Sequence, residues 1–223
     1  MYQPKHFAET RSEVLRAFIH EQPLGTLVTL DVAGELQANA LPFLLEPGPT
    51  PAGTLRGHVA RANPLWRETK PEIEALVVFQ GAQGYISPAW YPSKAEHGKV
   101  VPTWNYVVVQ ARGRLRAIDD AAWLRDFVGR LTDRFEAERT AAAAMPPAWK
   151  IGDAPEDFLQ SMLGAIVGIE IELSSLVGKY KLSQNRGAAD RQGALAAVQA
   201  LAEARGDAAT QALHAAMAAA GTT

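Results

Sequence analysis

The pattern of apolar and polar positions predicts a chain built mainly of short β-strands. Runs of alternating or β-branched apolar residues are bounded by Gly, Pro, Asn and Asp, which are typical of turns. The predicted strands are 24–30, 35–45, 54–59, 75–79, 84–87, 104–118 and 165–173, with a Gly-Ala-Gln-Gly turn at 81–84. The predicted helices are 10–21, 121–137, a short one within 60–68 and an alanine-rich stretch from residue 188 onward.

Many short strands with a few helices outside them are typical of a small closed or nearly closed barrel. We therefore expect a mainly β fold with flanking helices, of the α+β class. The 223 residues suffice for one large domain, or for one domain with an appended segment. We expect residues 1–187 to form the barrel domain and residues 188–223 to form an Ala-rich helical segment that packs on it or trails from it.

Composition excludes several classes of chemistry. The chain has no cysteine, which rules out disulfides, thiolate nucleophiles, iron–sulfur clusters and the usual structural zinc sites. Its 5 histidines are scattered without a His-x-x-x-His pair, so we expect no metal site. No Gly-x-Ser-x-Gly or Gly-x-Gly-x-x-Gly sequence occurs, which argues against a hydrolase elbow and against a Rossmann nucleotide site.

Charge and hydropathy bear on partners and location. The formal net charge is −2, whereas proteins that grip nucleic-acid phosphates usually show a basic excess or a basic face. Arg112, Arg114 and Arg116 share one strand face and could touch DNA phosphates, although a solvated barrel strand explains them as well. No run of about 18 apolar residues appears and the N-terminus shows no secretory pattern, so we expect a cytoplasmic protein with no membrane partner.

Polar and aromatic residues gather in four segments. In the first, GHVARANPLW, the side chains of His58, Arg61 and Asn63 lie at a strand end and a helix start. Free backbone N–H groups at such a junction, together with the bidentate guanidinium of Arg61, would form a phosphate cradle. A capped loop with a solvated arginine is the alternative interpretation.

The second and third segments are aromatic. In YISPAWY, Ser87 and Trp90 lie around a proline turn that could line a flat aromatic ligand, or simply plug the mouth of the barrel. In VPTWNY, Thr103 and Asn105 project to one side of a strand and Trp104 to the other. A core tryptophan between two edge-capping polar residues explains this last pattern equally well.

The fourth segment, KYKLSQNR, suits an anion. Lys179 and Lys181 have the same parity, as do Ser183 and Asn185, so an extended chain presents two ammonium groups, a hydroxyl and an amide along one side. A solvated basic loop is the alternative. Together the four segments describe a ligand with an anionic end and a planar aromatic end, such as a phosphorylated flavin or pyridoxal.

The same segments carry a family resemblance. The opening MYQPKHF, GHVARANPLW, YISPAWYPSKAEHGKVVPTWNY and GKYKLSQNR occur in the order seen in PaiB-type FMN-binding split-barrel proteins, often labelled negative transcriptional regulators. The chain resembles this family from about residue 1 to about residue 195. Tyr180 is a mild departure, because the family has tryptophan there.

The resemblance implies a fold like that of pyridoxamine 5'-phosphate oxidase, a split barrel that forms a homodimer with FMN at the subunit interface. Arg61 and Asn63, with His58 nearby, would then lie at the FMN phosphate, and the backbone of residues 39–42 would face the flavin ring edge. The implied neighbours of the ring or the ribityl chain are Ser87, Trp90, Thr103, Trp104 and Asn105. The residues implied to close the site, from the same or the partner subunit, are Lys179, Lys181, Ser183, Gln184 and Asn185.

Three functions stay open at this point. The first is an FMN-binding regulator of the PaiB type, which would bind DNA or a protein partner. The second is an FMN-dependent oxidoreductase that acts on an unidentified small molecule. The third is a storage or scavenging flavoprotein. The sequence assigns no catalytic residue for any of them.

Overall fold

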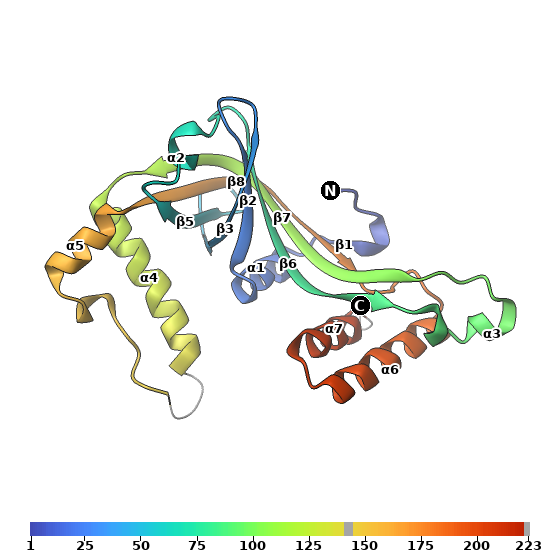
Figure 1. Cartoon of the computed structure of the whole chain (residues 1–223). Coiled ribbons are helices and arrows are strands. Elements are labelled where there is room, and N and C mark those ends of the chain that lie inside the picture. The colour runs from blue at the N-terminus through green and yellow to red at the C-terminus, as the bar shows by residue number, and fades with distance from the viewer. Residues whose placement is uncertain (141–144, 221–223) are drawn as a thin grey trace. The chain divides into compact units, whose positions relative to one another are not determined.

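The computed structural model describes residues 1–140 and 145–220 (Figure 1). The strands are β1 (Ala8–Glu9), β2 (Leu24–Leu30), β3 (Leu36–Pro42), β4 (Leu44–Glu46), β5 (Thr54–Ala60), β6 (Ala75–Ile86), β7 (Thr103–Ile118) and β8 (Ile166–Lys181). The helices are α1 (Ser12–Glu21), α2 (Leu65–Glu68), α3 (Ser93–His97), α4 (Ala121–Thr140), α5 (Glu156–Gly164), α6 (Ala188–Arg205) and α7 (Ala208–Ala219). Short 3-10 helices lie at Lys5–Phe7, Pro88–Trp90 and Ile151–Asp153. No helix within these described ranges has both the length and the apolar character needed to cross a membrane.

The strands in the described ranges form an eight-stranded sheet with the order β3-β2-β6-β7-β8-β5-β4, and β1 pairs with β8. β2 is antiparallel to both β3 and β6, and β5 is antiparallel to both β4 and β8. The expected fold class, mainly β with flanking helices, is confirmed. The long pairing of β5 with β8 joins segments that are distant in the sequence, so it could not be read from local pattern.

The turn predicted at residues 81–84 is wrong, because β6 runs through these residues without a break. A Cβ atom at Gly81 would come within 2.6 Å of the Phe18 ring, and one at Gly84 within 2.5 Å of the Leu213 side chain. The two glycines therefore allow α1 and α7 to approach the strand. Glycine takes this role inside strands as well as its better-known role in turns.

Two other strand boundaries differ from the prediction. The strand expected at 35–45 is divided into β3 and β4 at Phe43, whose side chain is fully buried and whose N–H donates to the carbonyl oxygen of Pro23 at 2.9 Å. The last strand continues to Lys181 instead of ending at residue 173. The extension pairs with β1 in the register Ala8 to Lys179, a pairing that the sequence did not reveal.

The chain divides into two compact units. The first unit contains Met1–Gln22, Phe79–Gln110 and Leu176–Thr223, and the second unit contains Pro23–Val78 and Ala111–Ser175. The strands β6, β7 and β8 supply residues to both units.

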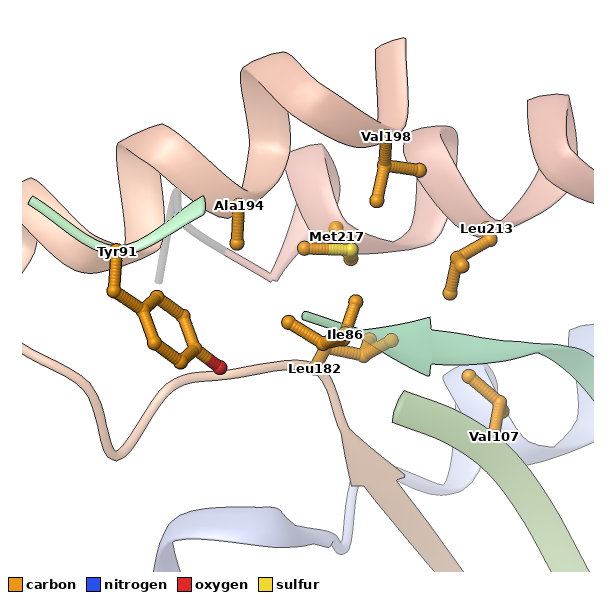
Figure 2. Close-up of a cluster of buried hydrophobic side chains, with 8 residues drawn as sticks. All are labelled: Ile86, Tyr91, Val107, Leu182, Ala194, Val198, Leu213 and Met217. Atoms are coloured by element: carbon orange, nitrogen blue, oxygen red, sulfur yellow. The ribbon is translucent and has the colours of Figure 1, made fainter. Parts of the chain in front are cut away.

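In the first unit, helices α6 and α7 lie side by side (Figure 1). They are separated at Gly206, whose φ of +64° is in the left-handed region that favours glycine. Residues 221–223 lie outside the described residues, and the division into domains at residue 187 stays a prediction. Figure 2 shows the buried cluster that joins these helices to the strands: Ile86, Tyr91, Val107, Leu182, Ala194, Val198, Leu213 and Met217.

In the second unit, α4 buries the apolar stripe that its sequence predicts. The Trp123 ring stacks on the Phe127 ring with 5.2 Å between centroids, and Phe127 is fully buried. Leu124, on the same helix, packs with Leu159 and Leu163 of α5. The helix is therefore held by burial of large apolar side chains, which is the main stabilising contribution to such packing.

A chain of alternating charges also lies in the second unit. Glu170 on β8 is only 7% exposed and accepts hydrogen bonds from Arg56 Nε at 2.7 Å and from Arg116 Nη2 at 2.5 Å. Arg56 also pairs with Glu46, which pairs in turn with Arg130. Burial acts to raise the pKa of Glu170, but the hydrogen bonds from the two arginines outweigh burial and hold this pKa below its usual value.

We expect the substitution Glu170→Gln to lower the free energy of unfolding by about 1–3 kcal/mol, because it leaves the guanidinium of Arg56 without its buried carboxylate. Urea unfolding at neutral pH measures this change. The control is Glu156→Gln, which removes an exposed partner of Arg125 and should change stability little. Equal, small changes in the two variants would contradict a stabilising role for the Glu170 network.

Candidate functional site

Two lysines near the end of β8 lie beside residues of β7 in the first unit. Lys181 Nζ donates to Thr103 Oγ1 and, at 2.6 Å, to the carbonyl oxygen of Trp104. Lys179 Nζ lies 5.4 Å from the centroid of the Tyr106 ring, and Lys181 Nζ lies 5.9 Å from the same centroid. These five residues form the lysine–aromatic cluster.

The ammonium groups of this cluster have no carboxylate partner in the described part of the chain. Lys179 is 9% exposed, and its ammonium group faces the rings of Tyr2 and Tyr106. Burial lowers the pKa of Lys181, and the nearby charges of Lys179 and Arg186 lower it further. Two partly buried cations this close repel each other, so a bound anion would stabilise the site.

Trp104, whose carbonyl oxygen accepts from Lys181, carries one of two neighbouring exposed rings. Trp104 is 48% exposed and Tyr85 is 50% exposed, and their ring centroids are 6.3 Å apart in an edge-on arrangement. Two exposed aromatic rings this close together offer a flat apolar surface to a planar ligand. The site therefore offers positive charge and flat apolar surface together, which is what the phosphate and the ring of FMN require.

The turn that follows β8 is held by three of the predicted site residues. Ser183 has a φ of +71°, which is strained for a residue other than glycine, and its Oγ accepts from Asn105 Nδ2 at 3.0 Å. Asn105 is fully buried. The Gln184 side chain accepts from the N–H of Leu182 at 2.7 Å and donates to the carbonyl oxygen of Tyr180 at 2.6 Å. These side chains position the end of β8, and their predicted direct contact with FMN stays a prediction.

The remaining predicted residues of the first unit have other surroundings. Ser87 caps the 3-10 helix at Pro88–Trp90, where its Oγ accepts from the N–H of Ala89 at 3.2 Å. Trp90 packs against the buried cluster of Figure 2. Asn185 is exposed within the turn. Their contacts with the flavin ring or ribityl chain stay predictions.

Arg61, the predicted phosphate ligand, is engaged within the second unit. Its guanidinium donates to both carboxylate oxygens of Asp119, at 2.8 and 2.5 Å. It also donates to the carbonyl oxygens of Gly164 and Ile166, at 2.7 and 3.1 Å. These bonds occupy most of the donors that an arginine has. Phosphate binding by Arg61 would require the guanidinium to exchange these partners.

His58 is half-buried in the second unit. Its ring centroid is 6.0 Å from that of Phe127, and its Nδ1 is buried without a hydrogen-bond partner among the described residues. Burial lowers the pKa of His58, so the imidazole is neutral at neutral pH. This environment is typical of a core histidine, and the predicted place of His58 near the phosphate stays a prediction.

Asn63 lines a polar pocket of about 510 Å³ in the second unit. Its Nδ2 donates to Asn39 Oδ1 at 2.8 Å, and its Oδ1 accepts from the N–H of Leu65 at 3.0 Å. Thr29 lines the same pocket, and its Oγ1 is buried without a hydrogen-bond partner among the described residues. Asp31 lines the pocket and no lysine or arginine does, so the pocket suits a neutral hydroxyl or amide group rather than a phosphate.

The first unit thus holds the predicted lysines, Thr103 and Trp104 in one cluster, whereas the predicted phosphate ligands belong to the second unit. Contact of a single FMN with both sets stays a prediction. Sequence reasoning missed Tyr106 and Thr29. Tyr106 has the parity of Trp104 in the same segment, which was a usable signal, whereas the orphaned hydroxyl of Thr29 depends on tertiary packing.

Comparison with known proteins identifies the family of the chain. Residues 1–175 match the family model described as "Putative FMN-binding domain". An uncharacterized protein of Aspergillus fumigatus is 33% identical, over 87% of this chain and 89% of its own. Protease synthase and sporulation protein PAI 2 of Bacillus subtilis is 33% identical, over 85% of each chain. The solved structure of the FAD and Heme binding protein from Mycobacterium smegmatis has a TM-score of 0.51 at 18% identity, and the match covers 78% of this chain and 73% of that one.

The fold is therefore that of a flavin-binding split barrel. The chain belongs to the PaiB-type family of FMN-binding proteins, and its cofactor is FMN. The predictions of family, fold class and cofactor are confirmed. The matched range of the family model ends at residue 175, so Lys179 and Lys181 lie beyond it.

The buried imidazole of His58 generates a prediction for pH dependence. Because its folded-state pKa is lowered, the unfolded chain takes up a proton that the folded chain does not as the pH falls below about 6.5, the usual value. This contribution to stability is present above that pH and is lost as the pH falls. Thermal unfolding followed between mildly alkaline and mildly acidic pH should show a smaller loss in His58→Leu than in the unchanged chain. The control His97→Gln, at an exposed position, should keep the full loss; a full loss in His58→Leu would refute the assignment.

Proposed function

We propose that this FMN-binding protein holds the phosphate of FMN at the lysine–aromatic cluster. The observation that carries the proposal is the burial of Lys179 beside Lys181 without a carboxylate partner in the described residues. A phosphate monoester carries about −1.5 to −2 charges at neutral pH, which two ammonium groups match. Thr103 accepts from Lys181 and fixes the direction of its side chain.

The exposed faces of Trp104 and Tyr85 support an adjacent position for the flavin ring. A flavin ring packed on them would lose contact with water on one of its faces. FMN supplies the redox chemistry when it is bound, while the protein binds, orients and shields it. An FMN-dependent oxidoreductase acting on a small molecule is therefore an alternative function that the same geometry supports.

We also propose that the protein is a cytoplasmic homodimer with FMN at the subunit interface. An apolar, unpaired sheet edge in the second unit supports the homodimer. β3 is the last strand of the sheet order, and Leu36 on it is 75% exposed. Leu24 is also 63% exposed, but it lies on the internal strand β2, opposite Pro42 and at the other end of the β2–β3 pair from Leu36. Apolar side chains at an unpaired edge are typical of an interface, because such an edge exposed to water invites association.

The flavin assignment predicts a phosphate-specific loss of affinity. Lys181→Met and Lys179→Met should each weaken FMN binding by about 10- to 100-fold, the equivalent of one charged hydrogen bond. Binding of riboflavin, which lacks the phosphate, should stay nearly unchanged in both variants. Flavin fluorescence quenching on titration with each protein measures the two affinities.

Lys94→Met is the matched control, because Lys94 is an exposed lysine on α3 of the same unit. It should leave both flavin affinities unchanged. Equal losses for FMN and riboflavin would place the lysines at the ring instead of the phosphate. No loss for either flavin would refute the site.

A regulatory role through DNA is the second candidate function. The relative PAI 2 is named for protease synthesis and sporulation, and Arg112 and Arg114 are exposed on β7. Arg116, in contrast, is bound to Glu170, so only two of the three aligned arginines have guanidinium groups available for phosphate. Direct DNA binding through this face would therefore be weak.

If this face binds duplex DNA, log affinity should fall with log salt with a slope of about −2, because each phosphate contact contributes about −0.9. Arg112→Met with Arg114→Met should abolish the slope, whereas Arg205→Met, at an exposed position on α6, should not. Fluorescence anisotropy of a labelled duplex over a salt series measures it. Absence of binding at low salt would remove direct DNA contact and leave regulation to a protein partner.

A further inference from the structure

A second hollow, which the flavin proposal leaves unused, lies in the first unit. Its volume is about 640 Å³, within the range of small-molecule sites. The N-terminal segment around Arg11, the end of β8 at Tyr180, and helices α6 and α7 line it. Tyr180 projects to the face of β8 opposite Lys179 and Lys181, because side chains alternate along a strand. This Tyr180 pocket is therefore distinct from the lysine–aromatic cluster.

The pocket contains one arginine whose charge is uncompensated. Arg191 Nη2 makes a long contact of 3.4 Å with the carbonyl oxygen of Met217, and no carboxylate of the described residues pairs with this guanidinium. Arg11, in contrast, is paired with Glu9 at 2.6 and 3.0 Å. His6 also lines the pocket. The charges of Arg11 and Glu9 cancel, so the charge of Arg191 leaves the cavity with an excess of positive charge.

The hydroxyl of Tyr180 adds a neutral donor to this charge. Burial raises the pKa of Tyr180 to about 12, with further upward contributions from Glu9 and Glu21. The hydroxyl therefore keeps its proton at neutral pH. It has no hydrogen-bond partner among the described residues, so it is available to a ligand.

The rest of the lining is largely apolar. Val14 of α1 and Ala216 and Ala220 at the end of α7 contribute small aliphatic surfaces. The amide of Gln184 is already used by the turn after β8. The groups left for a ligand are a cationic donor, a neutral donor and an aliphatic wall. A ligand with a negatively charged hydrogen-bond acceptor and a short hydrocarbon tail would match the cationic donor, the neutral donor and the aliphatic wall.

We infer that the Tyr180 pocket binds a small organic anion, a carboxylate with a short aliphatic tail, whose carboxylate meets Arg191 and the Tyr180 hydroxyl and whose tail packs on Ala216 and Val14. Arg191 can bind a carboxylate through two N–H groups at once. The aliphatic tail would gain the burial of its methylene groups, each of which contributes modestly. This inference does not depend on where FMN binds.

Titration with hexanoate, followed by calorimetry on the full chain, tests the inference. Arg191→Met should weaken hexanoate binding at least about tenfold, as the loss of a charged hydrogen bond predicts. Arg205→Met, an exposed arginine on the same helix, should leave it unchanged. Tyr180→Phe, which keeps the ring, should produce a smaller loss. Hexanamide, which has the same tail but no charge, should bind weakly and equally to all these variants.

Equal hexanoate affinity in Arg191→Met and Arg205→Met would overturn the inference, as would hexanamide binding as tight as that of hexanoate. Ala216→Leu is an independent test, because the larger side chain would fill the space proposed for the aliphatic tail and should abolish hexanoate binding. If Arg191→Met does not fold, Tyr180→Phe and Ala216→Leu decide the question. Lys181→Met should leave hexanoate binding intact whatever it does to FMN, which separates this test from that of the flavin site.

Discussion

The proposed flavin site depends most directly on the position of two ammonium groups at the end of β8. Lys179 is about nine-tenths buried. Burial, together with the positive charges of Lys179 and Arg186, lowers the pKa of Lys181. Buried charges are costly unless an opposite charge or several hydrogen bonds compensate them. In the described residues, aromatic rings, one hydroxyl and one carbonyl oxygen surround them, and no carboxylate does. A bound anion is the compensation that this arrangement lacks.

The surrounding structure fixes these lysines at some cost. Ser183 has a left-handed backbone conformation that few residues other than glycine adopt. The buried amide of Asn105 donates a hydrogen bond to the Ser183 hydroxyl and so fixes this residue in place. Strain and buried polar networks of this kind persist where the rest of the fold determines them strongly, and they are frequent at functional sites. The turn after β8 therefore helps to position Lys181. Its polar side chains do so by bonding to one another and to the backbone.

Sequence reasoning succeeded where the chemistry was local. The parity of Lys179 and Lys181 correctly indicated a shared side, and the α4 stripe from Trp123 to Phe135 was readable from helical spacing. It failed where tertiary contacts decide. Gly81 looked like a turn residue, yet it provides room for Phe18. The pairing of Arg61 with Asp119, which lies far along the chain, could not be read from any local pattern, and contact of Arg61 with a phosphate stays a prediction.

The central claim, that the phosphate of FMN compensates the charges of Lys179 and Lys181, is tested most directly by a crystal structure of the protein grown with FMN. The account predicts electron density for a phosphate within hydrogen-bond distance of at least one of the two lysine Nζ atoms. Density that places the phosphate on Arg61, released from Asp119, with both lysines away from it, would contradict the account.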